Sequence, residues 1–303
     1  MKNLIKITIC LFIISLAGNS HAALRVVTTT EDLAAIARAV GGSLIDAVSL
    51  TPGTRDPHFA EAKPSMIRKV YQADLLILVG ADLEIGWLPP LLQSARNSQV
   101  QPSSAGYLDL SSAVALLGQL TGPVSRAMGD VHAKGNPHYW LDPRNGGRMA
   151  RAIANRLGEL DPQHSADYQA RLVAFEQTLA RKLAEWQTAL APLQGQSVIA
   201  YHTSLIYLAH AFDFTITDEV EPKPGISPSA YHLSQLVQRI QKEQISLLIM
   251  EPYYERRSAR YLNDQTGIKI AVLPQSVGSM PRIESYFDLF DHIVAVLTQA
   301  RRS

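Results

Sequence analysis

The sequence predicts an α/β protein of two lobes, each with a mainly parallel sheet flanked by helices, joined by one long backbone helix. Three observations support this class. Short apolar or β-branched runs alternate with helical patterns in both halves of the chain. One long amphipathic pattern separates the two halves. The 303 residues are enough for two ordinary domains.

The first half begins with a β-branched run, Leu24–Thr30, followed by acidic residues that suit the first turn of a helix. Gly41 and Gly42 end that helix. The apolar run Leu75–Val79 is typical of a parallel strand that is covered on both faces. We therefore expect strands over 24–30, 47–50 and 74–80, and helices over 31–40 and 65–71.

The pattern between the halves predicts one long helix from Asp161 to Leu190. Its apolar residues recur at spacings of three and four, so they share one face: Leu172, Phe175, Leu179, Leu183, Trp186 and Leu190. Pro162 stands in the first turn, where proline is tolerated, and Pro192 follows the end. At about 1.5 Å per residue, the helix would span on the order of 40 Å and could cross a whole domain.

The second half repeats the alternation of strands and helices, and this predicts a second parallel sheet. Strands are expected over 198–201, 214–217, 247–250 and 268–273, and helices over 204–211, 227–242, 255–265 and 283–297. The predicted organisation is an N-terminal lobe over 23–160, a linking helix over 161–192 and a C-terminal lobe over 193–303.

Residues 1–22 have the pattern of a cleaved secretory signal. Lys2 and Lys6 give a basic start, an apolar run covers 7–17, and Ser20 and Ala22 are small residues at the expected cleavage site. The apolar run is too short for a spanning helix, which needs about 20 such residues. An uncleaved anchor is the alternative. We expect an exported protein in a bacterial periplasm.

Composition restricts the chemistry of the exported chain. Cys10 is the only cysteine and lies in the signal, so the remainder has no disulfide and no thiolate ligand. No cysteine stands at the cleavage site to carry a lipid. Without Lys2 and Lys6, 26 basic residues face 27 acidic ones. This balance predicts no nucleic acid partner.

Three histidines are the candidate metal ligands: His58, His138 and His202. His58 and His138 follow Asp-Pro and Asn-Pro in loops, and His202 lies just after a predicted strand. Neutral imidazole is the commonest side-chain ligand for zinc. The three positions are far apart in the sequence, so only the tertiary fold could bring them together. The alternative for each one alone is an ordinary surface histidine.

Further polar residues stand at the ends of predicted strands. Glu251 directly ends the strand over 247–250, and Gln275 follows the strand over 268–273. Ligands of open parallel sheets bind beyond the carboxyl ends of the strands, so these positions describe a site between two lobes. His132, in the loop before His138, is expected to be solvated, with weak metal capture as the alternative.

The remaining candidates receive structural interpretations. Asp56 is expected to form a turn. Asp142 could set the orientation of a metal ligand by a hydrogen bond to it. Trp87 and Trp140 are expected to pack in the core. The other histidines outside the signal are expected to be structural or exposed: His164, His210, His232 and His292.

No enzyme motif competes with a metal-binding function. The glycine pairs at 41–42 and 146–147 do not form a nucleotide-binding loop, and the sequence contains no His-Glu-x-x-His. Two other functions stay open. Three histidines could hold a zinc ion that activates water, with Glu251 as general base. The same cleft could instead bind a metal chelate or a small organic ligand.

These residues resemble the zinc and manganese solute-binding proteins of ABC transporters, over nearly the whole exported length. The matching motifs are Pro52–His58, Lys63–Ser65, Ala73–Asp74, Val79–Glu84 with Trp87, Asn136–Pro143, Tyr201–His202, Ile226–Ser229 and Glu251–Pro252. The resemblance implies two α/β lobes on a rigid helix with the metal between them. It also implies a monomer that delivers the metal to a permease in the inner membrane and is not an enzyme.

The resemblance places the first three family ligands on His58, His138 and His202. The fourth family ligand is often an aspartate, but the corresponding position here is Gln275, whose neutral amide oxygen is a weaker ligand. Glu251 is the nearest carboxylate by strand position, and water is the other alternative. Three imidazoles and one oxygen suit Zn²⁺, whereas Mn²⁺ prefers more oxygen ligands, so we expect zinc first and manganese second. The His-rich loop of many zinc members is missing, since only His132 lies in 119–137.

Overall fold

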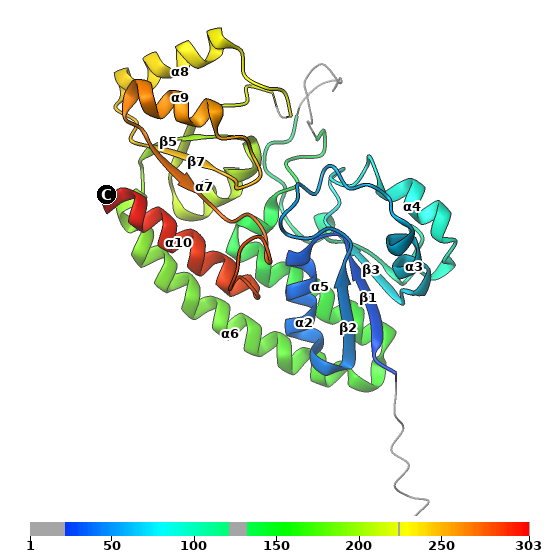
Figure 1. Ribbon diagram of the computed structural model, residues 1–303. Helices are drawn as coiled ribbons and strands as arrows, with labels where there is room; N and C mark the ends of the chain where they lie inside the picture. Colours follow the sequence, from blue (N-terminus) through cyan, green and yellow to red (C-terminus); the bar gives the residue numbers. More distant parts are fainter. Residues whose placement is uncertain (1–21, 121–131, 224, 303) are drawn as a thin grey trace, which may run out of the picture.

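The computed structural model describes residues 22–120, 132–223 and 225–302 (Figure 1). The predicted signal segment, residues 1–22, lies outside this part of the chain except for Ala22. Within the described ranges, no helix has the length and apolar character needed to cross a membrane.

The N-terminal lobe is built on a parallel sheet in the order β2-β1-β3-β4. Its strands are β1 (Leu24–Thr28), β2 (Ile45–Ser49), β3 (Leu75–Leu78) and β4 (Tyr107–Asp109). All four residues of β3 are buried, as the continuous apolar run predicts for a strand covered on both faces. Helices α2 (Glu31–Gly41), α3 (Pro64–Gln72) and α4 (Leu88–Ala95) belong to this lobe.

The C-terminal lobe repeats the same winding, in the order β6-β5-β7-β8, and its pairings are also parallel. Its strands are β5 (Ser197–Ala200), β6 (Thr215–Glu219), β7 (Leu247–Met250) and β8 (Lys269–Val272). Its helices are α7 (Ile206–Phe212), α8 (Ala230–Glu243), α9 (Arg257–Thr266) and α10 (Tyr286–Arg302). The predicted fold class, two parallel α/β lobes on one long helix, is confirmed.

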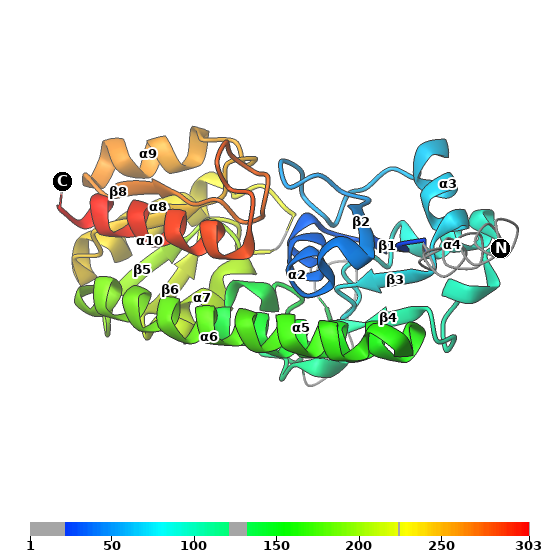
Figure 2. The same ribbon diagram turned by 90° about the horizontal axis from the view of Figure 1, so that it is seen from below.

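The long helix α6 (Ser165–Leu190) runs beneath both lobes, as Figure 2 shows. The predicted apolar face is buried at Leu172, Phe175, Leu179, Trp186 and Leu190, while Leu183 is half-buried. Aromatic contacts fix α6 to α10, with ring centroids 4.9 Å apart for Phe175 and Phe287 and 5.1 Å apart for Trp186 and Phe290. The domain boundaries at 160 and 192 stay a prediction.

Helix α5 (Pro143–Leu160) was not expected from the sequence, and it packs along α6 beneath the N-terminal lobe (Figure 2). Asp142 caps its first turn by accepting from the backbone N–H of Arg144, and Pro143 stands at the first position. Gly146 is required in this turn, because a Cβ there would lie 2.3 Å from Cε1 of Tyr286. The glycine pair therefore allows a close helix crossing.

Polar contacts also connect the lobes directly. The buried carboxylate of Asp32, on α2, accepts hydrogen bonds from Ser276 Oγ at 2.5 Å and from the backbone N–H of Val277 at 2.9 Å. The Trp140 indole donates to the carbonyl of Gln275 at 2.9 Å. The loop after β8 is therefore fixed to the N-terminal lobe.

Stability should depend on pH through Asp32, because burial raises the pKa of this carboxyl to about 7. In the unfolded chain the carboxyl titrates near 4, so the folded state binds the extra proton between these values. This contribution to stability is complete below pH 4 and is lost as pH rises through about 7. We expect urea unfolding in the presence of a chelator to show a smaller fall in stability from pH 5 to pH 8 for Asp32→Asn than for the unmodified protein. Equal falls would contradict this role, since all other titrating groups are shared.

Candidate metal centre

The three predicted histidines meet between the lobes. Ring centroids are 5.1 Å apart for His58 and His138, 6.0 Å for His138 and His202, and 6.3 Å for His58 and His202. His58 follows β2 of the N-terminal sheet, whereas His202 follows β5 of the C-terminal sheet. The fold therefore brings together residues that are 80 and 64 positions apart in the sequence.

The loop that carries His58 is held by hydrogen bonds on both sides of the histidine. The Trp87 indole, which is buried as expected, donates to the Pro57 carbonyl at 3.0 Å. Asp56 forms the expected turn, since its Oδ1 accepts from the backbone N–H of His58 at 2.9 Å. The hydrogen bonds of Asp56 and of the Pro57 carbonyl thus fix the position of His58 within its loop.

The loop that carries His138 is bound to both lobes through Asn136. The Asn136 side chain accepts from the backbone N–H of His138 at 3.0 Å and donates to the carbonyl of Thr203 at 2.9 Å, next to His202. One amide side chain therefore sets the spacing of two candidate ligands. This role of Asn136 was not predicted from the sequence, although the Asn-Pro step before His138 was the visible signal.

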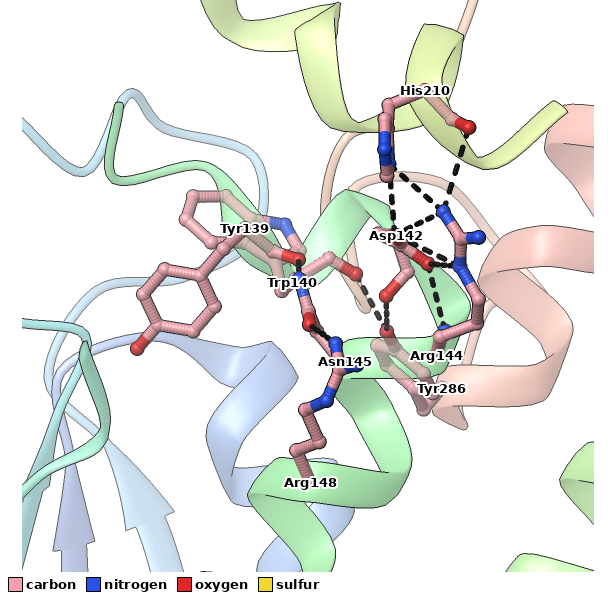
Figure 3. Close-up of polar contacts among 8 residues, drawn as sticks. All are labelled: Tyr139, Trp140, Asp142, Arg144, Asn145, Arg148, His210 and Tyr286. Atoms are coloured by element: carbon pink, nitrogen blue, oxygen red, sulfur yellow. Dashed lines mark hydrogen bonds and ion pairs between the residues drawn. The ribbon is translucent and has the colours of Figure 1, made fainter. Parts of the chain in front are cut away.

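The residues after His138 are anchored to three helices (Figure 3). The Tyr286 hydroxyl, from α10, donates to the Trp140 carbonyl at 2.6 Å. Asp142 holds Arg144 through two hydrogen-bonded oxygens and lies 3.6 Å from the ring of His210 on α7. The expectation that Asp142 orients a ligand is wrong, because its carboxylate is engaged by Arg144.

Two candidate ligands have a carboxylate behind the ring. Nδ1 of His58 donates to Asp56 Oδ1 at 2.7 Å, and Nδ1 of His202 donates to Glu221 Oε2 at 3.2 Å. Each bond places the ring proton on Nδ1, so that Nε2 carries the lone pair, which is the usual arrangement for imidazoles that bind metals. Glu221 was not predicted from the sequence. The sequence feature that could have identified Glu221 is the Glu221-Pro222 step after a strand, which has the same form as Glu251-Pro252.

Burial and neighbouring charges shift the pKa values of the rings and carboxyl groups of the site in different directions. Burial and the neighbouring histidines lower the pKa of His138 well below its usual range. Burial alone would raise the pKa of Asp56, but the hydrogen bond and charge of His58 lower it. Burial acts to lower the pKa of His202, yet Glu221 and Glu251 together raise it. The cluster combines ligand-competent imidazoles with negative charge that attracts a cation.

Glu251 is the buried carboxyl of the site. Its Oε1 accepts from Ser204 Oγ and, at 3.3 Å, from the Gln275 amide, while its Oε2 has no hydrogen-bond partner among the described residues. Burial raises the pKa of Glu251 to about 7 although the charge of His202 opposes this. Residues His202 and Glu251 end the neighbouring strands β5 and β7, where the strand order reverses, which is the usual ligand position in such sheets.

Gln275 lies in the same network but its amide is already committed. The side-chain oxygen accepts from the Tyr253 hydroxyl, and the nitrogen donates to Glu251. We therefore interpret Gln275 as a residue that positions Glu251.

The spacing of the rings is close to that needed for one shared ion. Two imidazoles on a tetrahedral zinc, with Zn–N of about 2.0 Å, have ring centroids roughly 5 Å apart. His58 and His138 meet this distance, whereas His202 is about 1 Å too far from both rings. Accordingly, no three His, Cys, Asp or Glu side chains of the described residues could hold a metal ion as they stand. Within the described part of the chain, Nδ1 of His138 and Oε2 of Glu251 are buried and have no hydrogen-bond partner, and a cation within reach would satisfy such atoms.

Two lobes on one long helix, with imidazoles from both lobes meeting between them, define a two-lobed binding protein. The chain belongs to the family described as zinc-uptake complex component A, periplasmic (ZnuA), whose model matches residues 26–300.

Known relatives of the chain include proteins named for zinc and for manganese. The high-affinity zinc uptake system protein ZnuA of Yersinia pestis is 27% identical over 285 residues, which are 88% of each chain. The manganese ABC transporter substrate-binding lipoprotein PsaA of Streptococcus pneumoniae is 26% identical over 258 residues, or 82% of this chain and 78% of PsaA. A crystal structure of ZnuA matches with a TM-score of 0.76 at 24% identity, over 92% of this chain and 99% of that one, and shows the fold.

The hydrogen bonds predict the tautomer of two histidines in the metal-free protein. His58 and His202 should carry their proton on Nδ1, because Asp56 and Glu221 accept it. Long-range ¹H–¹⁵N correlation spectra in the presence of a chelator would identify the protonated nitrogen. Replacing Asp56 with alanine should release His58 alone from this preference, with His202 as the internal control. A proton on Nε2 of His58, with Nδ1 unprotonated, would contradict the assignment.

Proposed function

We propose that this protein captures one divalent transition metal ion between its lobes and delivers it to an ABC transporter permease in the inner membrane. The proposed ligands are His58, His138, His202 and Glu251. The metal is the transported substrate, and no reaction is carried out on it, so the protein is not an enzyme.

The observation that carries this proposal is the pair of carboxylate-backed imidazoles from different lobes. Asp56 fixes His58 from the N-terminal lobe, and Glu221 fixes His202 from the C-terminal lobe. Histidines that bind metals usually donate the N–H of the other ring nitrogen to a carboxylate or carbonyl, and both rings have this arrangement. The free carboxylate oxygen of Glu251 supports its assignment as the oxygen ligand.

The donor set favours Zn²⁺ over Mn²⁺. Imidazole suits zinc, whereas carboxylate, carbonyl and water oxygens suit manganese. Three imidazoles and one carboxylate give the four donors that zinc usually takes. Manganese is the second candidate, in agreement with the name of the pneumococcal relative.

We propose that small shifts, not a large hinge motion, accompany binding and release. The contacts of α6 with both lobes and the hydrogen bonds of Asp32 to the C-terminal lobe support this limit. A movement of about 1 Å at His202 would bring its ring to ligand spacing. We also propose that the protein acts as a periplasmic monomer, cleaved after its signal and not lipidated, with N-terminal lobe 23–160, linking helix 161–192 and C-terminal lobe 193–303.

Competition titrations of the purified protein with Zn²⁺ and Mn²⁺, against a chelator of known affinity, test the proposal. We expect one-to-one binding that is tighter for Zn²⁺. His138→Ala should weaken zinc binding more than about 100-fold, since losing only a partner of a ligand costs 10–100-fold. His292→Ala, on α10 and away from the site, is the matched control. Absence of tight binding for both free metals would refute the proposal and favour a chelated or organic ligand.

The carboxylates that accept from the histidine rings, Asp56 and Glu221, should contribute to zinc affinity nearly as much as the ligands do. Asp56→Ala and Glu221→Ala should each weaken zinc binding by about 10–100-fold, because the ring loses its fixed tautomer and orientation. Glu243→Ala, an exposed carboxylate on α8, serves as the control in the same titration. Affinities of the two variants equal to that of the control would show that the carboxylates do not support metal ligands.

A further inference from the structure

A fourth histidine enters the cluster from the loop before His138. Nε2 of His132 lies 3.2 Å from Nε2 of His58, and the two ring centroids are 5.3 Å apart. The ring of His132 is half-buried, so the expectation of a solvated loop residue is wrong. None of the sequence motifs pointed to this contact.

The distance between the two nitrogens matches that of two ligands on one ion. With Zn–N distances of about 2.0 Å and tetrahedral angles, two ligand nitrogens are roughly 3.3 Å apart. The Nδ1 proton of His58 is held by Asp56, so its Nε2 presents a lone pair toward His132. In the metal-free protein the N–H of His132 can donate to this lone pair, and an ion between the nitrogens would replace that proton.

The loop holds His132 on the N-terminal side of the site. The His132 carbonyl accepts from the backbone N–H of Gly135 at 3.1 Å, and the next charged residue, Lys134, lies 3.4 Å from Asp82. Gly135 has a φ of +127°, and a Cβ there would lie 2.8 Å from the Cβ of Leu116. A turn that only glycine can adopt therefore brings the chain from His132 back to Asn136 and His138.

We propose that His132 is a further ligand of the bound metal and shares the ion with His58. This inference rests on the proposed function and deepens it. A fourth nitrogen donor favours zinc over manganese, because imidazole suits the former and oxygen donors the latter. His132 is then a determinant of metal selectivity as well as of affinity.

The test compares His132→Ala with the unmodified protein and with His292→Ala. Zn²⁺ and Mn²⁺ affinities come from competition titration, and Co²⁺ absorption spectra report the coordination without reference to transport. We expect zinc binding to weaken at least about tenfold, because losing even a hydrogen-bond partner of a ligand weakens metal binding by about 10–100-fold. The affinity for manganese should fall by a smaller factor. The Co²⁺ spectrum should change in His132→Ala and stay unchanged in His292→Ala. Thermal unfolding of the metal-free variants, which should be alike, checks that the fold is kept.

The outcomes separate this inference from the proposed function. Tight zinc binding by both proteins, with identical Co²⁺ spectra, would overturn the role of His132 and leave the three-histidine site standing. A loss of affinity that is equal for zinc and manganese would overturn its role in selectivity. Failure of the unmodified protein to bind zinc, manganese or cobalt would instead refute the proposed function itself.

Discussion

The packing of one long helix beneath both sheets is the constraint on which the rest of the structure depends. Helix α6 buries aromatic and leucine side chains along its length, and α5 and α10 pack against it from the two lobes. Both sheets therefore rest on the same helix, with His58 in the loop after β2 of one lobe and His202 just after β5 of the other. If this packing limits the swing of the lobes, as proposed above, the ligands must be nearly in place before the ion arrives.

That requirement explains why so many hydrogen bonds converge on the histidines. Asp56, Glu221 and Asn136 each hold a ring or the backbone of a ligand loop. Each lobe also has a buried glutamate, and the two differ in their hydrogen bonds. In the N-terminal lobe, Glu84 accepts from Thr29 Oγ1 and from two backbone N–H groups. In the C-terminal lobe, Glu251 keeps one oxygen free beside His202.

The sequence was informative wherever a local pattern decides the structure. The apolar run 247–250 became β7 with the same bounds, and the spacing of three and four from Leu172 onward gave the buried face of α6. Helix α5 escaped prediction because two glycines in its first turn resemble a loop, and their reason is the tertiary contact of Gly146 with Tyr286. The three candidate histidines were recognisable from strand ends and Pro-His motifs. The contact of His132 with His58 and the bond of Glu221 to His202 join positions that are 74 and 19 residues apart, so no local pattern contains them.

The central claim, that histidines of both lobes converge on one metal ion, is tested most directly by a crystal structure of the protein grown with Zn²⁺. An anomalous difference map collected on both sides of the zinc absorption edge would locate the ion. We expect one strong peak between the lobes, about 2.0–2.1 Å from ring nitrogens of His58, His138 and His202. A zinc peak confined to surface histidines, with the interlobe site showing none, would contradict it.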